Sequence, residues 1–245
     1  MDKIINMTLP KISCLCPTYG RPRQLEHAIE SFLRQDYAGE KELIVLNDYG
    51  EQSLIFHHPQ VKIYNINDRI KPLGAKFNAT AGLATGDLLA IWEDDDIYLP
   101  WRLSYSVEHL NEHNIYHTAS AWFEEDAHKL VPSRNLYHCN LLMSREVFRS
   151  VGSYSEVRDS GAIDVLLFDE LRKRYGTITQ EIADKDRFYI YRWGTSGAYH
   201  ASGWSTNIVS ELAAQHVAQH NKIRGIVELK PHWPYEYTEY LPCAR

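Results

Sequence analysis

Short apolar runs alternate with amphipathic stretches over the first half of the chain. Four of these runs contain few charged residues and end at polar or turn-forming residues, a pattern typical of buried strands. The four runs are residues 11–16, 41–48, 61–67 and 87–92. Their regular alternation with helical segments predicts an α/β fold with a mostly parallel sheet covered by helices.

Three segments of the first half show helical patterns. Residues 21–35 repeat apolar side chains at helical spacing, and residues 73–86 are rich in small residues that permit close packing. Residues 101–113 begin just after Pro100. A parallel sheet binds ligands beyond the carboxyl ends of its strands, where the strand order reverses. The polar residues that follow the first, second and fourth strands are therefore expected to meet in one crevice.

The second half of the chain is less regular, and its tail is rich in proline and tyrosine. We expect strands at residues 118–125, 128–132, 137–143 and 187–193. We expect helices at residues 144–152, 162–176 and 205–221. Ser144 is the expected N-cap of the first helix, and a Gly/Ser-rich loop is expected at residues 194–205. The tail, residues 231–245, is expected to form an extended strap against the body or a partner.

Bulk composition narrows the class of protein. The chain has 245 residues, 44% of them apolar, which suffices for a sizeable core, and we see no linker or repeat that would divide it. Its net charge of −6 argues against broad binding to nucleic-acid phosphates. No apolar run approaches the roughly 20 residues of a membrane span, and the start lacks a signal-peptide pattern, so a cytoplasmic protein is expected. The four cysteines lack zinc spacing and are expected to be reduced thiols.

An unusual run of acids follows the fourth predicted strand. In the segment DLLAIWEDDDIYLP, the strand leads directly into Glu93, Asp94, Asp95 and Asp96. Like charges this close repel one another unless a cation neutralises them. Carboxylate oxygens at a strand end suit Mg²⁺ or Mn²⁺, itself held by a diphosphate. A solvated acidic turn is the alternative, and the buried strand before the acids argues against it.

Four segments in order resemble the family 2 glycosyltransferases of GT-A fold. They are PTYGRP, LIVLND, GAKFNATAGLATGD and WEDDDIYLPWRL. The resemblance covers residues 11–105 well and extends more loosely to residue 205. It implies a Rossmann-like mixed sheet flanked by helices, in a single domain of residues 1–245. It also implies that residues 1–105 bind a nucleotide-sugar, most simply a UDP-sugar, and that residues 106–245 bind the acceptor. Transfer would proceed with inversion and with Mn²⁺ or Mg²⁺.

The resemblance implies roles for residues near the first two strand ends. Asp48 takes the place of the aspartate that accepts the uracil N3–H, a role that suits an ionised carboxylate. Thr18 and Tyr19, directly after Pro17, would line the base and the ribose. An ordinary turn aspartate beside Gly50 is the alternative for Asp48.

Further donor-site residues follow from the same resemblance. Lys76 and Asn78 resemble the basic residue and asparagine that line the donor cleft in the family, and lysine is a natural partner of phosphate. A solvated helix lysine is the alternative. Arg21 and Arg23 would meet either phosphate or solvent.

The acid run aligns with the metal motif of the family. In that alignment Asp94 contacts the ribose or the metal, and Asp95 ligates the metal directly. Glu93 takes a place that is often Asp or Thr in the family, and Asp96 shapes the turn. His200 resembles the histidine that many GT-A enzymes send to the metal, although the chain has 12 histidines and a surface role is the alternative.

An inverting transfer also needs a base that accepts the proton of the acceptor hydroxyl. In the family this base is an aspartate at a helix start, often in a Glu-Asp pair, and Asp164 matches that place. Ile163 stands where the acidic partner is common, so Asp159 and Asp169 are rivals. Asp164 as a helix-capping or first-turn acid is the alternative.

Several questions stay open at this stage. A nucleotidyltransferase acting on sugar phosphates, or a non-catalytic nucleotide-sugar-binding module, are the alternative functions. The acceptor remains open among a glycan, a lipid-linked sugar, a protein, a small molecule and a modified nucleic-acid base, and so does the oligomeric state. Arg192 and Trp193 resemble the end of a motif of processive relatives, but Tyr189 replaces its glutamine, so polymerisation is not expected.

Overall fold

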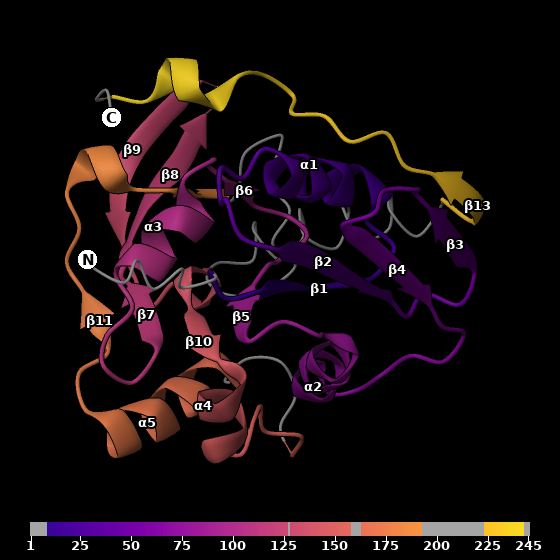
Figure 1. Ribbon diagram of the computed structural model, residues 1–245. Helices are drawn as coiled ribbons and strands as arrows, with labels where there is room; N and C mark the ends of the chain where they lie inside the picture. Colours follow the sequence, from indigo (N-terminus) through magenta and orange to yellow (C-terminus); the bar gives the residue numbers. More distant parts are fainter. Residues whose placement is uncertain (1–8, 127, 158–162, 193–222, 243–245) are drawn as a thin grey trace, which may run out of the picture.

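A seven-stranded mixed sheet forms the centre of the computed structural model, which describes residues 9–126, 128–157, 163–192 and 223–242 (Figure 1). From edge to edge its strands are β11 (Thr179–Gln180), β7 (Ile115–Thr118), β10 (Leu142–Ser144), β5 (Leu88–Ile91), β1 (Ile12–Thr18), β2 (Lys41–Asn47) and β4 (Val61–Asn65). β5, β1, β2 and β4 are parallel, whereas β10 is antiparallel to both of its neighbours. The predicted α/β fold with a largely parallel sheet is confirmed.

The strand order reverses at β1. The chain runs from β1 to β2 and β4 on one side, and then returns to the other side of β1 as β5. Ligand crevices of parallel sheets form at the carboxyl ends of such strands. This topology brings Thr18 at the end of β1, Asp48 just after β2 and the acids after β5 to one place.

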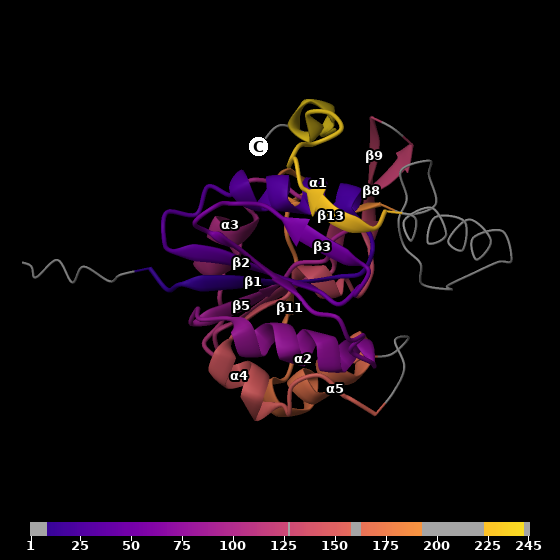
Figure 2. The same ribbon diagram turned by 90° about the vertical axis from the view of Figure 1, so that its right-hand side faces the viewer.

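Helices cover both faces of the sheet (Figure 2). They are α1 (Pro22–Leu33), α2 (Leu73–Leu83), α3 (Arg102–Glu108), α4 (Arg145–Ser150) and α5 (Ile163–Tyr175). Figure 2 shows α1 and α3 on one face and α2, α4 and α5 on the other. No helix in the described ranges is both long enough and apolar enough to span a bilayer.

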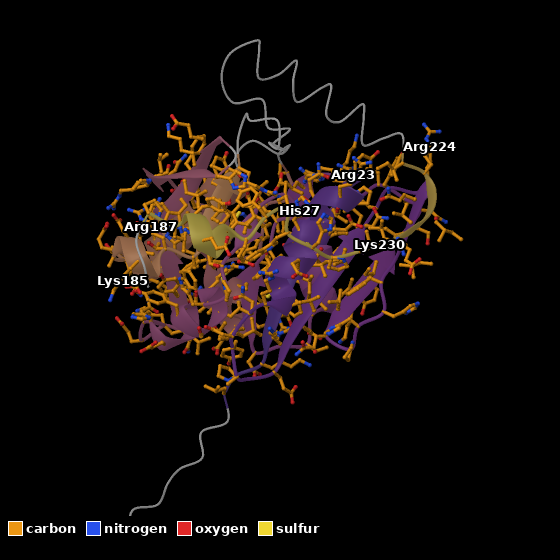
Figure 3. The ribbon with its side chains drawn as sticks, turned by 90° about the horizontal axis from the view of Figure 1, so that it is seen from above. Arg23, His27, Lys185, Arg187, Arg224 and Lys230 are labelled. Carbon is orange, nitrogen blue, oxygen red and sulfur yellow. The ribbon has the colours of Figure 1, made fainter. Side chains whose placement is uncertain are left out.

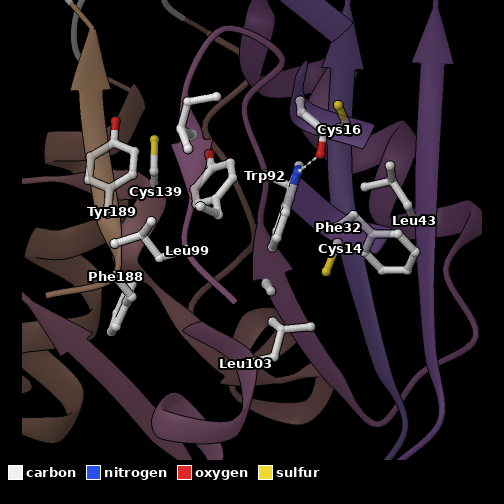
Figure 4. Packing of buried hydrophobic residues seen from close by; sticks show 14 of the residues in the cluster. Cys14, Cys16, Phe32, Leu43, Trp92, Leu99, Leu103, Cys139, Phe188 and Tyr189 are labelled. Carbon is white, nitrogen blue, oxygen red and sulfur yellow. Dashed lines mark hydrogen bonds between the residues drawn. The ribbon is translucent and has the colours of Figure 1, made fainter. Parts of the chain in front are cut away.

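Trp92, at the end of β5, fixes the start of the acid run in the core (Figure 4). It is completely buried, its indole N–H donates to the Ala28 carbonyl of α1 at 3.0 Å, and its ring packs on Tyr98 with centroids 4.1 Å apart. Full burial of such a side chain contributes on the order of 2–3 kcal/mol. The residues that follow Trp92 therefore start from a rigid point.

A second, four-stranded sheet lies beside the acids. Its strands are β6 (Ile97–Tyr98), β12 (Tyr189–Arg192), β8 (Ser120–Asp126) and β9 (Lys129–Arg134), in that order. β6 follows the acid run directly and pairs antiparallel with β12, which in turn pairs parallel with β8. The strand predicted at residues 187–193 is thus present as β12, and its position next to the acids is what the local pattern did not predict.

Residues 223–242, here called the strap, lie across α1 (Figure 1), and residues 231–242 are the described part of the strap predicted over residues 231–245. β13 (Gly225–Glu228) pairs parallel with β3 (Gln52–Ile55), and the chain then buries Trp233, whose indole N–H donates to Ser31 Oγ at 2.9 Å. Viewed from above, Arg224 and Lys230 of the strap lie on the same side of the molecule as Arg23 and His27 of α1 (Figure 3). The strap therefore packs on the body in its described part.

Some element predictions need correction. Residues 137–143 are not one strand: a 3-10 turn, η1 (His138–Asn140), precedes β10. The turn is stable because the buried Asn140 amide donates to the carbonyls of Thr118 and Ser120, in place of ladder hydrogen bonds. The predicted helix at residues 101–113 ends at Glu108, and β7 was missed. The predicted helix at 205–221 and the Gly/Ser loop at 194–205 lie outside the described residues.

Candidate active site

Side chains from three strand ends and α2 meet at the carboxyl edge of the sheet. Thr18 Oγ1 donates to Asp94 Oδ2 at 2.5 Å, which joins the end of β1 to the acid run. The Lys76 ammonium donates to the Thr18 carbonyl and to Asp48 Oδ1, the latter at 2.5 Å. Pro17 lies in β1 opposite Leu46 of β2. The expectation that these polar segments converge at one place is confirmed.

Asp48 is the most enclosed of these groups. Its side chain has no exposed surface; Oδ1 accepts from Lys76 and from Arg69 Nη1 at 3.2 Å, and Oδ2 accepts from the Ile70 N–H at 2.9 Å. Burial lowers the pKa of Lys76 to about 8, although the Asp48 charge opposes this shift. Lys76 therefore neutralises Asp48 in this structure rather than facing the crevice as a free phosphate-binding cation.

Arg21 is a cation that pairs with the acid run. Its guanidinium donates to Asp95 Oδ2 at 2.6 Å and also to Asp94 Oδ1. In this structure Arg21 pairs with the acids, which a divalent ion alone was expected to compensate, and its contact with phosphate stays a prediction. Burial nevertheless raises the pKa of Asp94 to about 6, with Arg21 lowering it and Asp95 raising it further.

Asp96 is held by β12. Tyr189 Oη donates to Asp96 Oδ2 at 2.5 Å, and the Arg192 backbone N–H donates to Oδ1 at 3.0 Å. Arg192 Nε also donates to the Asp95 carbonyl at 2.8 Å, and its Nη1 donates to His27 Nδ1 at 3.1 Å. The expectation that Asp96 shapes the turn agrees with these contacts. Sequence reasoning noticed Tyr189 and Arg192 as a broken motif but missed that both hold the acid run.

Glu93 is the most accessible of the four acids. Its side chain is 26% exposed, Oε1 lies 3.4 Å from His138 Nδ1, and the Glu93 N–H donates to Tyr98 Oη at 2.8 Å. His138 Nε2 is hydrogen-bonded to Tyr154 Oη. His138 was missed from the sequence because it lies in a segment with a strand-like pattern, 45 residues beyond Glu93.

The acid run offers donors for a metal ion. One oxygen each from Glu93, Asp95 and Asp96 lie within 4.8 Å of one another. Three carboxylate oxygens suit a hard divalent cation such as Mg²⁺ or Mn²⁺. Asp94 does not belong to this group, and its two oxygens are bonded to Thr18 and Arg21. The residues present therefore fit the expected metal.

Asn78 lies apart from the other predicted residues. Its amide donates to the Tyr154 carbonyl at 3.0 Å and to Glu156 at 2.7 Å, and it accepts from the Tyr154 N–H at 2.9 Å. These contacts tie α2 to the segment that precedes α5. The structure therefore uses Asn78 to join two elements and does not bring it into contact with Asp48 or Asp94.

Of the three aspartates considered as the base, Asp164 and Asp169 lie among the described residues and Asp159 does not. Asp164 is half-buried in the first turn of α5, and its Oδ1 accepts from the Val165 N–H at 2.8 Å. Asp169 is exposed, and one of its oxygens lies 3.9 Å from Arg172. Asp159 and the predicted metal ligand His200 lie outside the described residues. Asp164 thus remains the predicted base.

Comparisons with known proteins agree with this architecture. The family described as "Glycosyl transferase family 2" matches residues 13–152. EpsE of Bacillus subtilis (strain 168), which carries a glycosyltransferase name, is 28% identical over 173 residues, 61% of this chain and 62% of its own. The chain thus spans about three fifths of EpsE. The GalNAc(5)-diNAcBac-PP-undecaprenol β-1,3-glucosyltransferase of Campylobacter jejuni is 33% identical over 113 residues, 42% of this chain and 36% of its own.

Solved structures show the same fold. The mannosyltransferase PcManGT from Pyrobaculum calidifontis, in complex with GDP-Man and Mn²⁺, has a TM-score of 0.58 at 17% identity, covering 86% of this chain and 63% of its own. S. aureus TarS in complex with UDP-GlcNAc also has a TM-score of 0.58, at 13% identity, covering 94% and 69%. The predicted GT-A fold is confirmed. With a family match over more than half of its length, the chain belongs to glycosyltransferase family 2.

Proposed function

We propose that this protein transfers a sugar from a UDP-sugar to an acceptor hydroxyl, with inversion at the sugar carbon and with Mn²⁺ or Mg²⁺. The observation that carries the proposal is the joining of Asp48, Thr18 and Asp94 at the point where the strand order reverses. The relatives support a nucleotide-sugar donor, since TarS is seen with UDP-GlcNAc and PcManGT with GDP-Man and Mn²⁺.

In the proposed donor site the first half of the chain recognises the nucleotide. Asp48 accepts an N–H from the base, and Tyr19 packs against the base. Lys76 offsets the charge of the buried Asp48 carboxylate, to which its ammonium donates at 2.5 Å. The N3–H of uracil is such a base donor, and we favour a UDP-sugar because TarS, a neighbour of similar fold, is seen with UDP-GlcNAc.

The acid run holds the diphosphate end of the donor. Glu93, Asp95 and Asp96 supply the oxygens that would hold the metal, and Tyr189 and Arg192 keep the turn in place. When bound, the metal neutralises charge on the departing nucleoside diphosphate. Arg21, already on Asp94 and Asp95, adds a second positive charge at the same place.

The second half of the chain is proposed to bind the acceptor and to supply the base. A carboxylate oxygen of Asp164 takes the proton of the acceptor hydroxyl as that oxygen attacks the sugar. Asp164 suits this role because it is half-buried and lies in the first turn of α5. Residues 1–105 and 106–245 are thus proposed as the donor and acceptor halves of one domain.

A donor panel tests the proposal. Thermal unfolding is followed with UDP-, GDP- and dTDP-sugars, each with and without Mn²⁺, and products are identified by mass spectrometry. We expect stabilisation by a UDP-sugar that requires Mn²⁺, and slow release of UDP. Synthesis of a nucleotide-sugar from a sugar phosphate and a nucleoside triphosphate would instead indicate a nucleotidyltransferase. UDP binding without any UDP release would indicate a non-catalytic module.

A further inference from the structure

Arg69 lies where Asp48 and Tyr19 meet. Its guanidinium carbon is 3.4 Å from the centroid of the Tyr19 ring, and its Nη1 is 3.2 Å from Asp48 Oδ1. The edge of Tyr49 packs on Tyr19 with ring centroids 5.0 Å apart. A planar cationic group thus stacks on the aromatic ring and donates an N–H to the carboxylate at once.

A nucleobase in this subsite would make the same two contacts. The proposed function takes Tyr19 as the residue that packs on the base and Asp48 as the residue that accepts its N–H. Arg69 makes both contacts now, with one flat group of similar thickness. The guanidinium and the base therefore compete for the same ring face and the same oxygen.

Asp48 has no surface left for a base. Its side chain is 0% exposed, Oδ1 is shared by Lys76 and Arg69, and Oδ2 accepts from the Ile70 backbone. A base N–H reaches Asp48 only after one of these groups moves. Lys76 is 3% exposed and also bonded to the Thr18 carbonyl, whereas Arg69 is 39% exposed and has the longest contact. Arg69 is the group that moves at least cost.

We propose that Arg69 occupies the nucleobase subsite of the nucleotide-free protein and has to leave it before the base binds. The inference rests on the proposed function, since it takes Asp48 as the residue that recognises the base. Self-occupancy reduces the apparent affinity by the fraction of molecules whose subsite is open. One exposed ion pair and one stacked cation correspond to a factor of about 5 to 10.

Removing the side chain tests this directly. Binding of uridine and of UDP with Mn²⁺ is measured by calorimetry for the wild type, Arg69→Ala and Arg69→Gln. Uridine is the diagnostic probe because it has no phosphate. We expect both variants to bind uridine about five- to tenfold more tightly, since the ring of Tyr19 and Asp48 are then open.

Arg34→Ala is the matched control. Arg34 is 35% exposed, stacks on Trp233 at 4.1 Å and pairs with Glu236, so it has the same kinds of contact outside the crevice. Uridine affinity should not change in this variant. Melting temperatures without ligand confirm that all variants are folded.

The possible results separate the inference from the function on which it rests. Uridine affinity that is unchanged or weaker in Arg69→Ala overturns the inference, while wild-type binding of UDP leaves the proposed function intact. Weaker UDP binding with unchanged uridine binding would assign Arg69 to the diphosphate instead, and also overturns it. If the wild type binds neither uridine nor UDP, the proposed function fails and the inference fails with it.

Discussion

Two carboxylates at opposite ends of the same sheet have almost no exposed surface, but their pKa values are shifted in opposite directions. Glu42, at the amino end of β2, is 2% exposed, and Asp94, at the carboxyl end, is 1% exposed. Burial raises the pKa of both, but at Glu42 the hydrogen bonds from Lys62, Ser13 and Thr85 outweigh it and lower the pKa to about 2. At Asp94 burial dominates, and the pKa rises to about 6.

The number of donors explains the difference. Glu42 accepts from the Lys62 ammonium and Ser13 Oγ, both at 2.6 Å, and from the N–H and hydroxyl of Thr85 at 2.7 and 2.8 Å. Asp94 accepts from Thr18 and Arg21 and has Asp95 beside it. Glu42 is thus fully partnered by donors of the protein itself. At Asp94 the two donors do not outweigh burial and the neighbouring Asp95 charge, so its pKa stays raised.

Asp95→Asn tests the carboxyl end most severely. Loss of one ligand charge should weaken metal binding, so we expect transfer to fall by about a thousandfold or more. The Mn²⁺-dependent part of UDP affinity should disappear as well, measured by calorimetry with and without EDTA. Unchanged Mn²⁺ dependence would remove Asp95 from the metal site.

Asp164→Asn separates chemistry from binding. Loss of the proposed base should lower kcat by about a hundred- to thousandfold, while UDP affinity with Mn²⁺ stays at the wild-type value. Asp169→Asn, on the exposed side of the same helix, is the matched control and should retain full activity. Normal turnover in Asp164→Asn would make the base assignment wrong and bring Asp159 forward.

Glu42→Gln tests the amino end. Since the folded pKa lies below the usual value of 4.5, the ionised carboxylate stabilises the fold above that pH, and this contribution is lost as the pH falls towards about 2. We expect the variant to lose about 2–3 kcal/mol of unfolding free energy at pH 7. The difference from wild type should shrink between pH 4.5 and 2, measured by urea unfolding.

The exposed neighbour Glu40 supplies the control for this effect. Its side chain is 81% exposed, with Lys11 at 3.8 Å, so Glu40→Gln should change stability by less than about 0.5 kcal/mol at any pH. If Glu42→Gln lost the same free energy of unfolding at every pH, the shape of the Glu42 side chain and not its charge would be what stabilises the fold.

Tyr189→Phe makes the smallest change, one hydroxyl at the back of the acid run. Without the Tyr189 donor, Asp96 is held by fewer contacts, so we expect the Mn²⁺ concentration for half-maximal UDP binding to rise about threefold and stability to fall by about 1 kcal/mol. Tyr116→Phe is the control, because the buried Tyr116 hydroxyl has no hydrogen-bond partner among the described residues. Equal Mn²⁺ requirements in the two variants would contradict a positioning role for Tyr189.

Much of the site could be predicted from local sequence, because its residues lie in short segments that directly follow strands. The acids follow a strand, Asp48 follows another, and the reversal of strand order makes their meeting a consequence of topology. Asn78 shows the limit of such reasoning. It has the family's residue type at the family's position, but its amide is bonded to Tyr154 and Glu156, on a segment 76 and 78 residues away.

The sequence by itself determined the alternation of strands and helices and the acidic strand end, since each depends on neighbouring residues and their period. The GT-A class followed from the resemblance of four segments to family 2 glycosyltransferases. Only the tertiary structure decided which cations meet those acids. Arg21 lies 73 residues from Asp94 and Tyr189 lies 93 residues from Asp96. Arg69, which follows β4, stacks on Tyr19, which follows β1. Ion pairs and stacking depend on distances in space between side chains, and strand order rather than local periodicity determines those distances.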